Sequence, residues 1–318
     1  VVLAPDGASA QCLYGTEYGF QVFPGNTEKL LFYFQGGGAC WDRASTLANL
    51  CTSDLSPNGP EGVFDKENDQ NPFKDYTIVQ VLYCSGDVHG GNVTQPYKDM
   101  GKPVVQHGID NVKQVISWVN QQGFGGDDGV LEEMVVMGCS AGSIGAQLWA
   151  DIILKQYPAK LTAVVPDSYA GLFPPGSIGP YMKEFGMCDT DLVPDPIKPS
   201  CAAGNLDIQS LVISHMEEAP NTPFAFIQSK VDVVQQEFFI AVGLTTKGVS
   251  PLITPGLFYA GINGIFEMYN KVPNFVAYLI DGPKHCFTNF NVMYTANNEG
   301  PYGKRSSDEP SEGNLTLV

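Results

Sequence analysis

The most informative stretch of the chain runs from Met134 to Leu148 and reads MVVMGCSAGSIGAQL. Its first four residues, Met134–Met137, are continuously apolar, which is typical of a strand covered on both faces. Apolar residues then recur at helical spacing from Ile144 to Ile152. Between the two lies Gly138-Cys139-Ser140-Ala141-Gly142, of the form G-x-S-x-G. The sequence therefore predicts a strand, a sharp turn with Ser140 at its tip, and a helix.

Other parts of the chain repeat the alternation of strand and helix. Helical patterns run from Ile109 to Val119 and from Phe258 to Tyr269. Five more short apolar runs predict buried strands, and they are Lys29–Gln35, Tyr76–Tyr83, Ala163–Val165, Phe224–Ile227 and Phe275–Ile280. This order predicts a doubly wound, mostly parallel α/β sheet in one domain spanning residues 1–318.

Two segments depart from this alternation. Residues 172–222 are rich in proline and glycine, and we expect a long irregular insertion that serves as a lid or binding loop. Residues 297–318 are polar, and we expect a surface tail.

The composition restricts the partners that the chain can have. There are 34 acidic and 17 basic residues in 318, giving a formal net charge of −17, while only 16% of residues are charged. A surface this negative repels phosphate backbones and anionic membranes, so we expect no nucleic-acid or membrane partner. No apolar run reaches the roughly 18 residues that a membrane span requires.

Cysteines and glycosylation sequons indicate an extracellular protein. The chain has eight cysteines and two N-x-S/T sequons, at Asn92 and Asn314. Disulfides persist in oxidising compartments, so we expect secretion, with a signal peptide already removed.

Ser140 needs a base to become a nucleophile, and the chain offers four histidines. His107 and His215 fall in predicted helices and are expected to be structural, and His89 lies in a loop after the Tyr76–Tyr83 strand. His285 follows the last predicted strand, where an α/β-hydrolase places its catalytic histidine. The sequence therefore favours His285 as the base.

The acid should lie between Ser140 and His285, after the penultimate strand. Asp232 has this position and would hold the imidazole in the right tautomer. Asp167 is the second choice, although a structural role at the end of a strand is more typical. Asp281 is too near the strand that delivers His285.

Acyl transfer also requires donors for the developing oxyanion. Gly36, Gly37 and Gly38 follow the first long strand, where esterases carry a glycine-rich loop. We expect the amides of Gly37, Gly38 and Ala141 to form the oxyanion hole. A phosphate-binding loop is disfavoured because no Gly-Lys-Ser/Thr follows.

The positions of two cysteines support the assignment of serine and histidine. Cys139 precedes Ser140 and Cys286 follows His285, so a disulfide between them would tie the two side chains together. Two buried thiols are the alternative. The remaining pairs expected are Cys40–Cys51, Cys188–Cys201 and Cys12–Cys84.

As a set these motifs resemble the pectin acetylesterase / Notum carboxylesterase family over about residues 12 to 290. The stretches that carry the resemblance are Gln35–Cys40, Tyr83–Asp87, Gly138–Gly142, Pro166–Ser168, Val231-Asp232 with Gln235, and His285-Cys286. The resemblance implies an α/β-hydrolase-like fold, a Ser140–Asp232–His285 triad, an oxyanion loop at Gly37 and Gly38, and removal of acyl groups from a carbohydrate or another ester.

Three residues depart from the pattern of the family. Ala39 stands where a bulky Trp or Tyr is frequent, Gln35 replaces an acidic residue, and Ser143 replaces a glycine. The chemistry is expected to survive, whereas the acyl pocket is open to change. The Cys-Ser, Asp, His-Cys arrangement is also similar to tannase and feruloyl esterases.

The sequence thus predicts a secreted, monomeric serine carboxylesterase without metal or cofactor that removes acetyl groups from a polysaccharide such as pectin. Alternatives are a polyester depolymerase, a feruloyl-type esterase, and a catalytically silent binding module. A metal centre at Asp87 and His89 is weaker, because no third ligand is spaced nearby.

Overall fold

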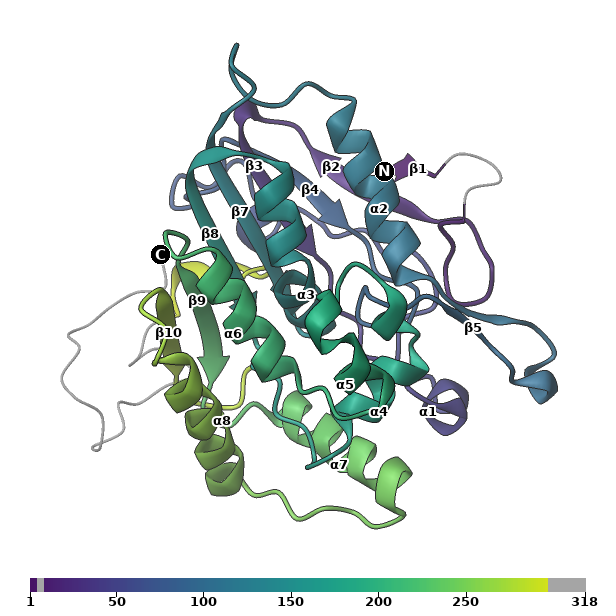
Figure 1. The fold of residues 1–318 in the computed structure, drawn as a ribbon. Coiled ribbons are helices and arrows are strands. Elements are labelled where there is room, and N and C mark those ends of the chain that lie inside the picture. Colours follow the sequence, from purple (N-terminus) through teal and green to yellow (C-terminus); the bar gives the residue numbers. More distant parts are fainter. Residues whose placement is uncertain (5–8, 297–318) are drawn as a thin grey trace.

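A computed structural model describes residues 1–4 and 9–296, and its centre is an eight-stranded sheet (Figure 1). The strand order is β1-β2-β4-β3-β7-β8-β9-β10. The strands of this sheet are β1 (Val2–Leu3), β2 (Gly19–Phe23), β3 (Asn26–Phe34), β4 (Tyr76–Val81), β7 (Leu131–Cys139), β8 (Ala159–Asp167), β9 (Phe224–Ser229) and β10 (Phe275–Ile280). A separate hairpin consists of β5 (Val93–Gln95) and β6 (Val104–Gln106).

From β4 to β10 all neighbouring strands of the large sheet are parallel, and the two antiparallel pairings, β1 with β2 and β2 with β4, lie at one edge. The α/β-hydrolase-like, mostly parallel fold expected from the sequence is therefore confirmed. The register aligns the carboxyl ends of the central strands, because Cys139 lies opposite Asp167 and Asp167 opposite Ile227. Residues just after β7, β8 and β9 consequently meet at one edge of the sheet.

The long helices α2, α3, α6 and α8 lie on the same face of the sheet, in front of it in Figure 1, and α7 lies beyond its carboxyl edge. The helices of the described residues are α1 (Arg43–Leu47), α2 (Gly108–Asn120), α3 (Ala141–Gln156), α4 (Ile178–Glu184), α5 (Lys198–Ala202), α6 (Ile208–Glu218), α7 (Val233–Lys247) and α8 (Pro255–Tyr269).

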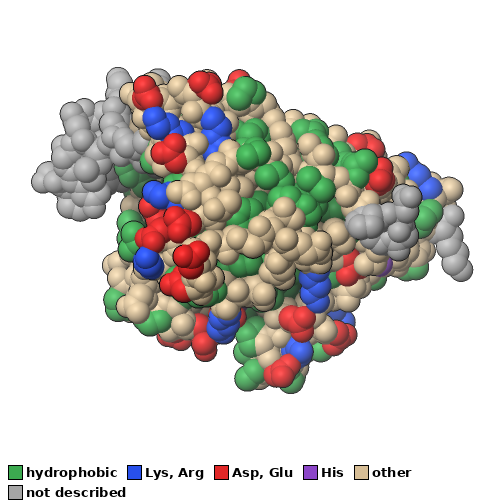
Figure 2. All heavy atoms as spheres, turned by 90° about the horizontal axis from the view of Figure 1, so that it is seen from above, with side chains coloured by type: hydrophobic (Ala, Val, Ile, Leu, Met, Phe, Trp, Pro, Cys, Tyr) green, Lys and Arg blue, Asp and Glu red, His purple; other side chains and the backbone are tan. Residues whose placement is uncertain are grey.

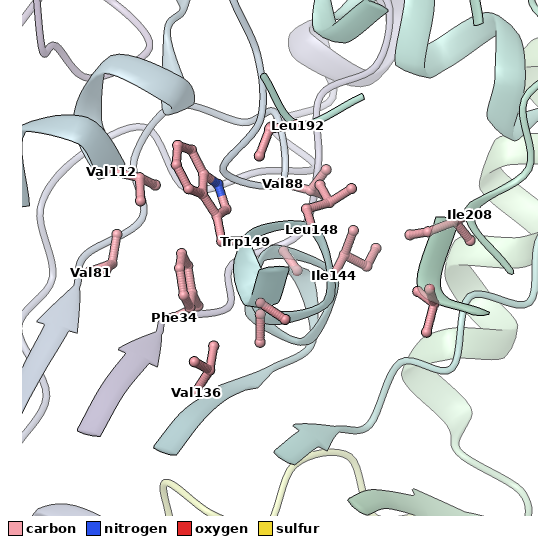
Figure 3. Packing of buried hydrophobic residues seen from close by; sticks show 14 of the residues in the cluster. Phe34, Val81, Val88, Val112, Val136, Ile144, Leu148, Trp149, Leu192 and Ile208 are labelled. Atoms are coloured by element: carbon pink, nitrogen blue, oxygen red, sulfur yellow. The ribbon is translucent and has the colours of Figure 1, made fainter. Parts of the chain in front are cut away.

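Alternate side chains of each central strand enter two different apolar layers, as the two-residue period of a strand requires. Phe32 and Phe34 of β3 pack against the helices, together with Val136, Ile144 and Trp149 (Figure 3). On the other face Leu31 and Tyr33 pack against Val63 and Phe64, which belong to a short 3₁₀ turn. The long helices thus cover one face, and irregular segments cover the other.

Two expectations from the sequence are wrong in detail. The insertion 172–222 is not irregular, because it contains α4, α5 and α6. Pro199 lies in the first turn of α5, a position that a helix tolerates but that resembles a loop in the sequence. β10 is not covered on both faces: it forms the edge of the sheet, and Val276 is 51% exposed.

The surface of the chain is largely uncharged, in keeping with the low content of charged residues. Seen from above, much of it is uncharged, with acidic and basic side chains in scattered patches (Figure 2). No helix in the described part of the chain is both long and apolar enough to cross a membrane. The predicted tail 297–318 and the sequon at Asn314 lie outside the described residues.

Candidate active site

Ser140 lies at the tip of the turn between β7 and α3. Its backbone has φ 60° and ψ −125°, a strained conformation for a residue other than glycine. The glycines on either side permit the turn: a Cβ on Gly138 would overlap the backbone of Gly142, and one on Gly142 would overlap the carbonyl oxygen of Phe34. The amide of Ser140 donates to the carbonyl of Asp167, 3.0 Å away. The geometry is that of a nucleophile elbow, as the sequence predicts.

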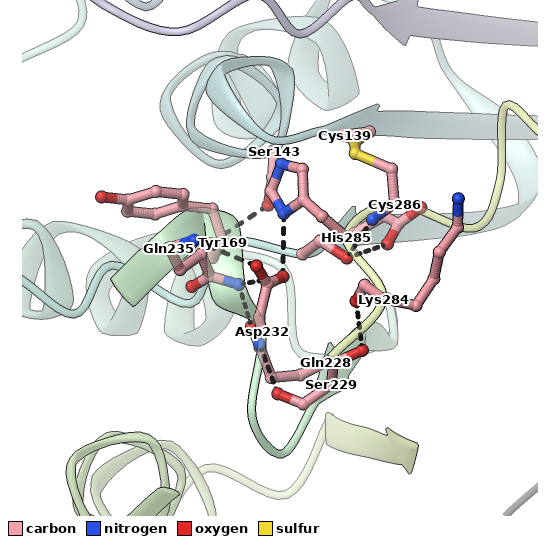
Figure 4. A network of polar contacts seen from close by, with 12 residues as sticks. Cys139, Ser143, Tyr169, Gln228, Ser229, Asp232, Gln235, Lys284, His285 and Cys286 are labelled. Atoms are coloured by element: carbon pink, nitrogen blue, oxygen red, sulfur yellow. Dashed lines mark hydrogen bonds and ion pairs between the residues drawn. A yellow bond between two sulfur atoms is a disulfide. The ribbon is translucent and has the colours of Figure 1, made fainter. Parts of the chain in front are cut away.

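His285 is bound to a buried carboxylate. Its Nδ1 lies 2.8 Å from Oδ2 of Asp232, which is fully buried (Figure 4). Since a carboxylate only accepts hydrogen bonds, Nδ1 is the donor in this contact, and Nε2 is the ring nitrogen that points away from Asp232. Asp232 caps α7 and also accepts from Gln235, through its amide at 3.0 Å and its Nε2 at 2.9 Å. These bonds fix the carboxylate in the orientation that meets the imidazole.

The side of the imidazole that points away from Asp232 makes no hydrogen bond within the described part of the chain. Nε2 of His285 is buried and has no hydrogen-bond partner among the described residues. A ring nitrogen of His285 and the sulfurs of Cys139 and Cys286 lie within 4.8 Å of one another. The two cysteines form a disulfide, with Cα atoms 5.7 Å apart. The structure therefore brings His285 next to the residue that precedes Ser140, with an unused acceptor on its ring.

The loops that carry Asp232 and His285 are held to each other at several points. The amide of Lys230 donates to Ile280, and the Ser229 hydroxyl donates to the carbonyl of Lys284 (Figure 4). Lys230, only 7% exposed, forms an ion pair with Asp281. Asp281 thus joins the two loops and does not contribute the acid.

The glycine loop lies beside Ser140. A Cβ on Gly36 would come within 2.9 Å of the Ser140 Cβ. Gly38 has φ 72°, and a Cβ there would overlap the carbonyl of Leu50. The amide of Thr52 donates to the carbonyl of Gly37 (2.8 Å), and the amide of Ala39 donates to that of Leu50 (3.0 Å). These two bonds hold the loop from its outer side. The loop and the amino end of α3 therefore flank the serine.

An apolar cavity opens at Ser140 and Gly38. Ile144 and Leu148 of α3 line it, opposite Phe238 and Val242 of α7. A third wall comes from the insertion and its flanks, through Tyr169, Phe173, Ile178, Tyr181, Met182 and Phe185. The insertion therefore shapes the space beside the serine.

Hydrogen bonds join two residues of the cavity lining, Trp41 and Tyr181, to threonines of α7. Trp41 donates from its indole nitrogen to Oγ1 of Thr245 at 2.8 Å, and the hydroxyls of Tyr181 and Thr246 are hydrogen-bonded. Trp41 and Tyr181 both line the cavity. These bonds connect the glycine-loop segment and the insertion to α7.

The other histidines serve the fold. Burial lowers the pKa of His89 to about 4, and its Nε2 lies 2.8 Å from the carbonyl of Gln35. Burial likewise lowers the pKa of His215, whose Nδ1 contacts the carbonyl of Gln147, and His107 stands at the N-cap position of α2 without a side-chain cap bond. Asp87 accepts from Ser85 and from the amide of Gly108.

A metal centre at Asp87 and His89 has little support from this arrangement. Within residues 1–4 and 9–296, the one group of three close His, Cys, Asp or Glu ligand atoms is Cys139, His285 and Cys286. The two sulfurs of that group are joined in a disulfide, so they are not available as thiolate ligands.

The structure contains four disulfides, all of them pairs expected from the sequence. They are Cys12–Cys84, Cys40–Cys51, Cys139–Cys286 and Cys188–Cys201. Asn92 is exposed at the start of the β5–β6 hairpin, where a glycan would meet solvent.

The sequence favours a structural role for Asp167 at the end of a strand, and the structure adds its partners. Its carboxylate is fully buried and accepts from the amides of Phe287 and Thr288, both at 2.8 Å, just after His285. Burial raises the pKa of Asp167, and the hydrogen bonds from Thr288 and Phe287 oppose that rise. The position of Asp167 at a strand end was visible in the sequence, but its partners were not.

The fold is α/β-hydrolase-like, and at the carboxyl edge of its sheet the site has a serine on a sharp strand–helix turn and a bonded Asp–His pair. The chain belongs to the pectinacetylesterase family, whose sequence profile matches residues 1–247. That range includes Ser140 and Asp232 but not His285.

Two relatives are informative. Over 172 residues the chain is 24% identical to palmitoleoyl-protein carboxylesterase NOTUM of Schmidtea mediterranea, and the match covers 49% of this chain and 31% of that protein. The chain thus matches less than a third of that relative. The crystal structure of the Wnt deacylase Notum from Drosophila superposes with a TM-score of 0.65 at 17% identity, covering 92% of this chain and 88% of that one. This second likeness concerns the fold alone.

Proposed function

We propose that the chain is a serine carboxylesterase that works through an acyl-enzyme, with Ser140 as nucleophile, His285 as base and Asp232 as its partner. The observation that carries the proposal is the 2.8 Å contact between Asp232 and Nδ1 of His285, which leaves a buried Nε2, unpartnered among the described residues, on a residue next to the Cys139–Cys286 disulfide. A hydroxyl becomes nucleophilic when such a base accepts its proton.

The reaction follows from these positions. Ser140 Oγ attacks the ester carbonyl carbon while its proton passes to Nε2 of His285. The amides of Gly37, Gly38 and Ala141 hold the oxyanion, the alcohol leaves with the proton from Nε2, and an acyl-serine remains. Water then attacks this ester in the same way, releasing the carboxylic acid and restoring Ser140. Asp232 stabilises the imidazolium in both halves.

The cavity supports a substrate with an acyl group larger than acetyl. Its lining is formed almost entirely by apolar side chains, so alkyl or aromatic carbon would be favoured there. The name of the planarian relative, a palmitoleoyl-protein carboxylesterase, supports the same direction.

An acetylated polysaccharide such as pectin, the substrate expected from the sequence, is here the second candidate, supported by the name of the family. We propose secretion and a monomeric enzyme in either case. Four disulfides support an oxidising compartment.

The test is hydrolysis of p-nitrophenyl acetate, butyrate and octanoate and of a feruloyl ester by the native chain and by Ser140→Ala. We expect kcat/KM to rise from acetate to the longer acyl groups and Ser140→Ala to be inactive. Ser143→Ala is the matched control, because Ser143 lies one turn into the same helix and bonds only to backbone and to Gln147. Turnover by Ser140→Ala at the native rate would refute the nucleophile. Best activity on acetate would restore the acetylesterase assignment, and binding of esters without turnover would indicate a silent binding module.

A further inference from the structure

Asp167 contacts both chain segments that the proposed reaction must bring together. Its backbone carbonyl accepts from the amide of Ser140 at 3.0 Å. Its Oδ2 accepts three bonds of 2.8 Å, from the amides of Phe287 and Thr288 and from the Thr288 hydroxyl. One buried residue at the end of β8 thus binds the nucleophile turn through its main chain and the segment after His285 through its side chain.

The next residue extends this contact to Cys286. The Ser168 hydroxyl donates to Oδ1 of Asp167 and accepts from the amide of Cys286 at 2.9 Å. The segment that follows His285 is therefore bound at three consecutive amides, those of Cys286, Phe287 and Thr288. All of these bonds are buried.

The backbone around these contacts is strained. Ser140, Ser168 and Cys286 have φ values of 60°, 58° and 65°, in the left-handed region that residues with a Cβ rarely adopt. Such conformations persist only where the surrounding contacts impose them. Cys286 follows His285 directly, so its conformation sets the direction in which the imidazole leaves the chain.

We propose that Asp167 is a positioning residue for the proposed reaction: as an acceptor for the 286–288 segment, it fixes His285 relative to Ser140. The inference rests on the proposed function of these two residues. The disulfide alone does not fix the imidazole, because it restrains only the sulfurs of Cys139 and Cys286, and rotation of the chain after His285 stays free without the three amide contacts.

The proposal requires that the side chain at position 167 accept hydrogen bonds, and it does not require a negative charge there. In Asp167→Asn the side-chain oxygen can still accept from Phe287 and Thr288, so we expect kcat within about threefold of native. In Asp167→Leu, of similar size, all three bonds to Oδ2 are lost. We expect its kcat to fall by about tenfold or more, with little change in KM, because the acyl cavity is not lined by Asp167.

A double-mutant cycle with His285→Ala separates a positioning effect of Asp167 on His285 from general damage to the fold. If Asp167 acts through His285, then Asp167→Leu should lower the residual activity of His285→Ala by less than about twofold. The low-field proton NMR signal of the His285–Asp232 hydrogen bond should also weaken or shift in Asp167→Leu and persist in Asp167→Asn.

The stability control is Val112→Ala, which truncates a fully buried side chain of α2 in the helix-side core. It should lower the unfolding midpoint but keep kcat and the low-field signal. If Asp167→Leu does not fold, Thr288→Val takes its place: it removes one of the three bonds to Oδ2 and leaves the two amide contacts, so we expect a smaller fall in kcat, about threefold, again with little change in KM.

The proposal is overturned if Asp167→Leu, or Thr288→Val in its place, keeps the native kcat, or if the loss is equally large in the His285→Ala background. Both outcomes leave the proposed function intact as long as Ser140→Ala is inactive. An active Ser140→Ala would instead remove the proposed function itself.

Discussion

The disulfide between Cys139 and Cys286 joins the residue before Ser140 to the residue after His285. It closes a loop across a sequence separation of 147 residues. Few other covalent links could restrict the approach of these two side chains so directly, because each cysteine is the immediate neighbour of one of them. The bond therefore contributes to stability and to the alignment of the proposed site.

Replacing both Cys139 and Cys286 by serine should lower stability and kcat together. The chain-entropy model gives a loss of up to about 5 kcal/mol for a loop of this length, and a freed His285 segment should lower kcat. Urea unfolding and steady-state kinetics measure the two effects. The matched control is the Cys12–Cys84 pair, whose separation of 72 residues gives about 4 kcal/mol in the same model. Equal loss of kcat in both variants would contradict a specific role for Cys139–Cys286.

Asp232→Asn should reduce kcat by about four orders of magnitude while the chain stays folded. Asparagine can still cap α7 by accepting from the Gln235 amide, but its NH₂ group or neutral oxygen no longer stabilises the imidazolium. Hydrolysis of p-nitrophenyl butyrate measures kcat, and thermal unfolding shows whether the variant is folded. A kcat within tenfold of native would argue against Asp232 as the acid, and Asp281→Asn provides the comparison at a neighbouring acidic residue.

Leu148→Phe should narrow the acyl cavity. Leu148 is buried on α3 and lines the cavity, so a larger ring there competes with the end of a long acyl chain. The ratio of kcat/KM for octanoate to that for acetate should fall by about tenfold or more, given what one methylene contributes in a tight pocket. An unchanged ratio would mean that acyl chains do not enter this cavity.

Lowering the pH should lower the free energy of unfolding of the chain, because of His89. Its pKa is about 4 in the folded chain and about 6.5 when unfolded, so between these values the unfolded chain binds more protons. This contribution is fully present above about pH 6.5 and is lost as the pH falls toward 4, by about 3 kcal/mol. The free energy of unfolding in urea, measured at pH 7.5 and 4.5, should drop less in His89→Gln than in the native chain. Equal drops would show that His89 is not buried in its neutral form.

Asn92 should carry a glycan when the chain is secreted from a eukaryotic host. The side chain is exposed, and the sequon Asn92-Val93-Thr94 is complete. Treatment with an endoglycosidase should lower the mass of the native chain by one glycan more than that of Asn92→Gln. No mass difference between the two would show that the sequon is not used.

Local signals allowed the central part of the site to be predicted. The apolar run before Ser140, the glycines around it and the helical pattern after it all lie within Met134–Ile152, so the elbow could be predicted from one segment. Asp232 and His285 could be selected because each follows a short apolar strand in the expected order.

Other features depend on residues distant in sequence, and they could not be predicted. The carboxylate of Asp167 meets amides 120 and 121 residues further on. The helix α7 has only a weak amphipathic pattern, since the side chains that it buries include Gln235 as well as Phe239 and Val242. The short helices of the insertion are stabilised by tertiary packing rather than by propensity, as isolated helices of that length are not stable.

The sequence by itself determined the order of the six parallel strands and of α2, α3 and α8, the turn at Ser140, and the proposal of His285 and Asp232, because these depend on local patterns and on position along the chain. Only the tertiary structure decided the acyl cavity and the anchoring of the 286–288 segment. The cavity is lined by the glycine loop, α3, the insertion and α7, and a space enclosed by four separate segments has no signature in any one of them.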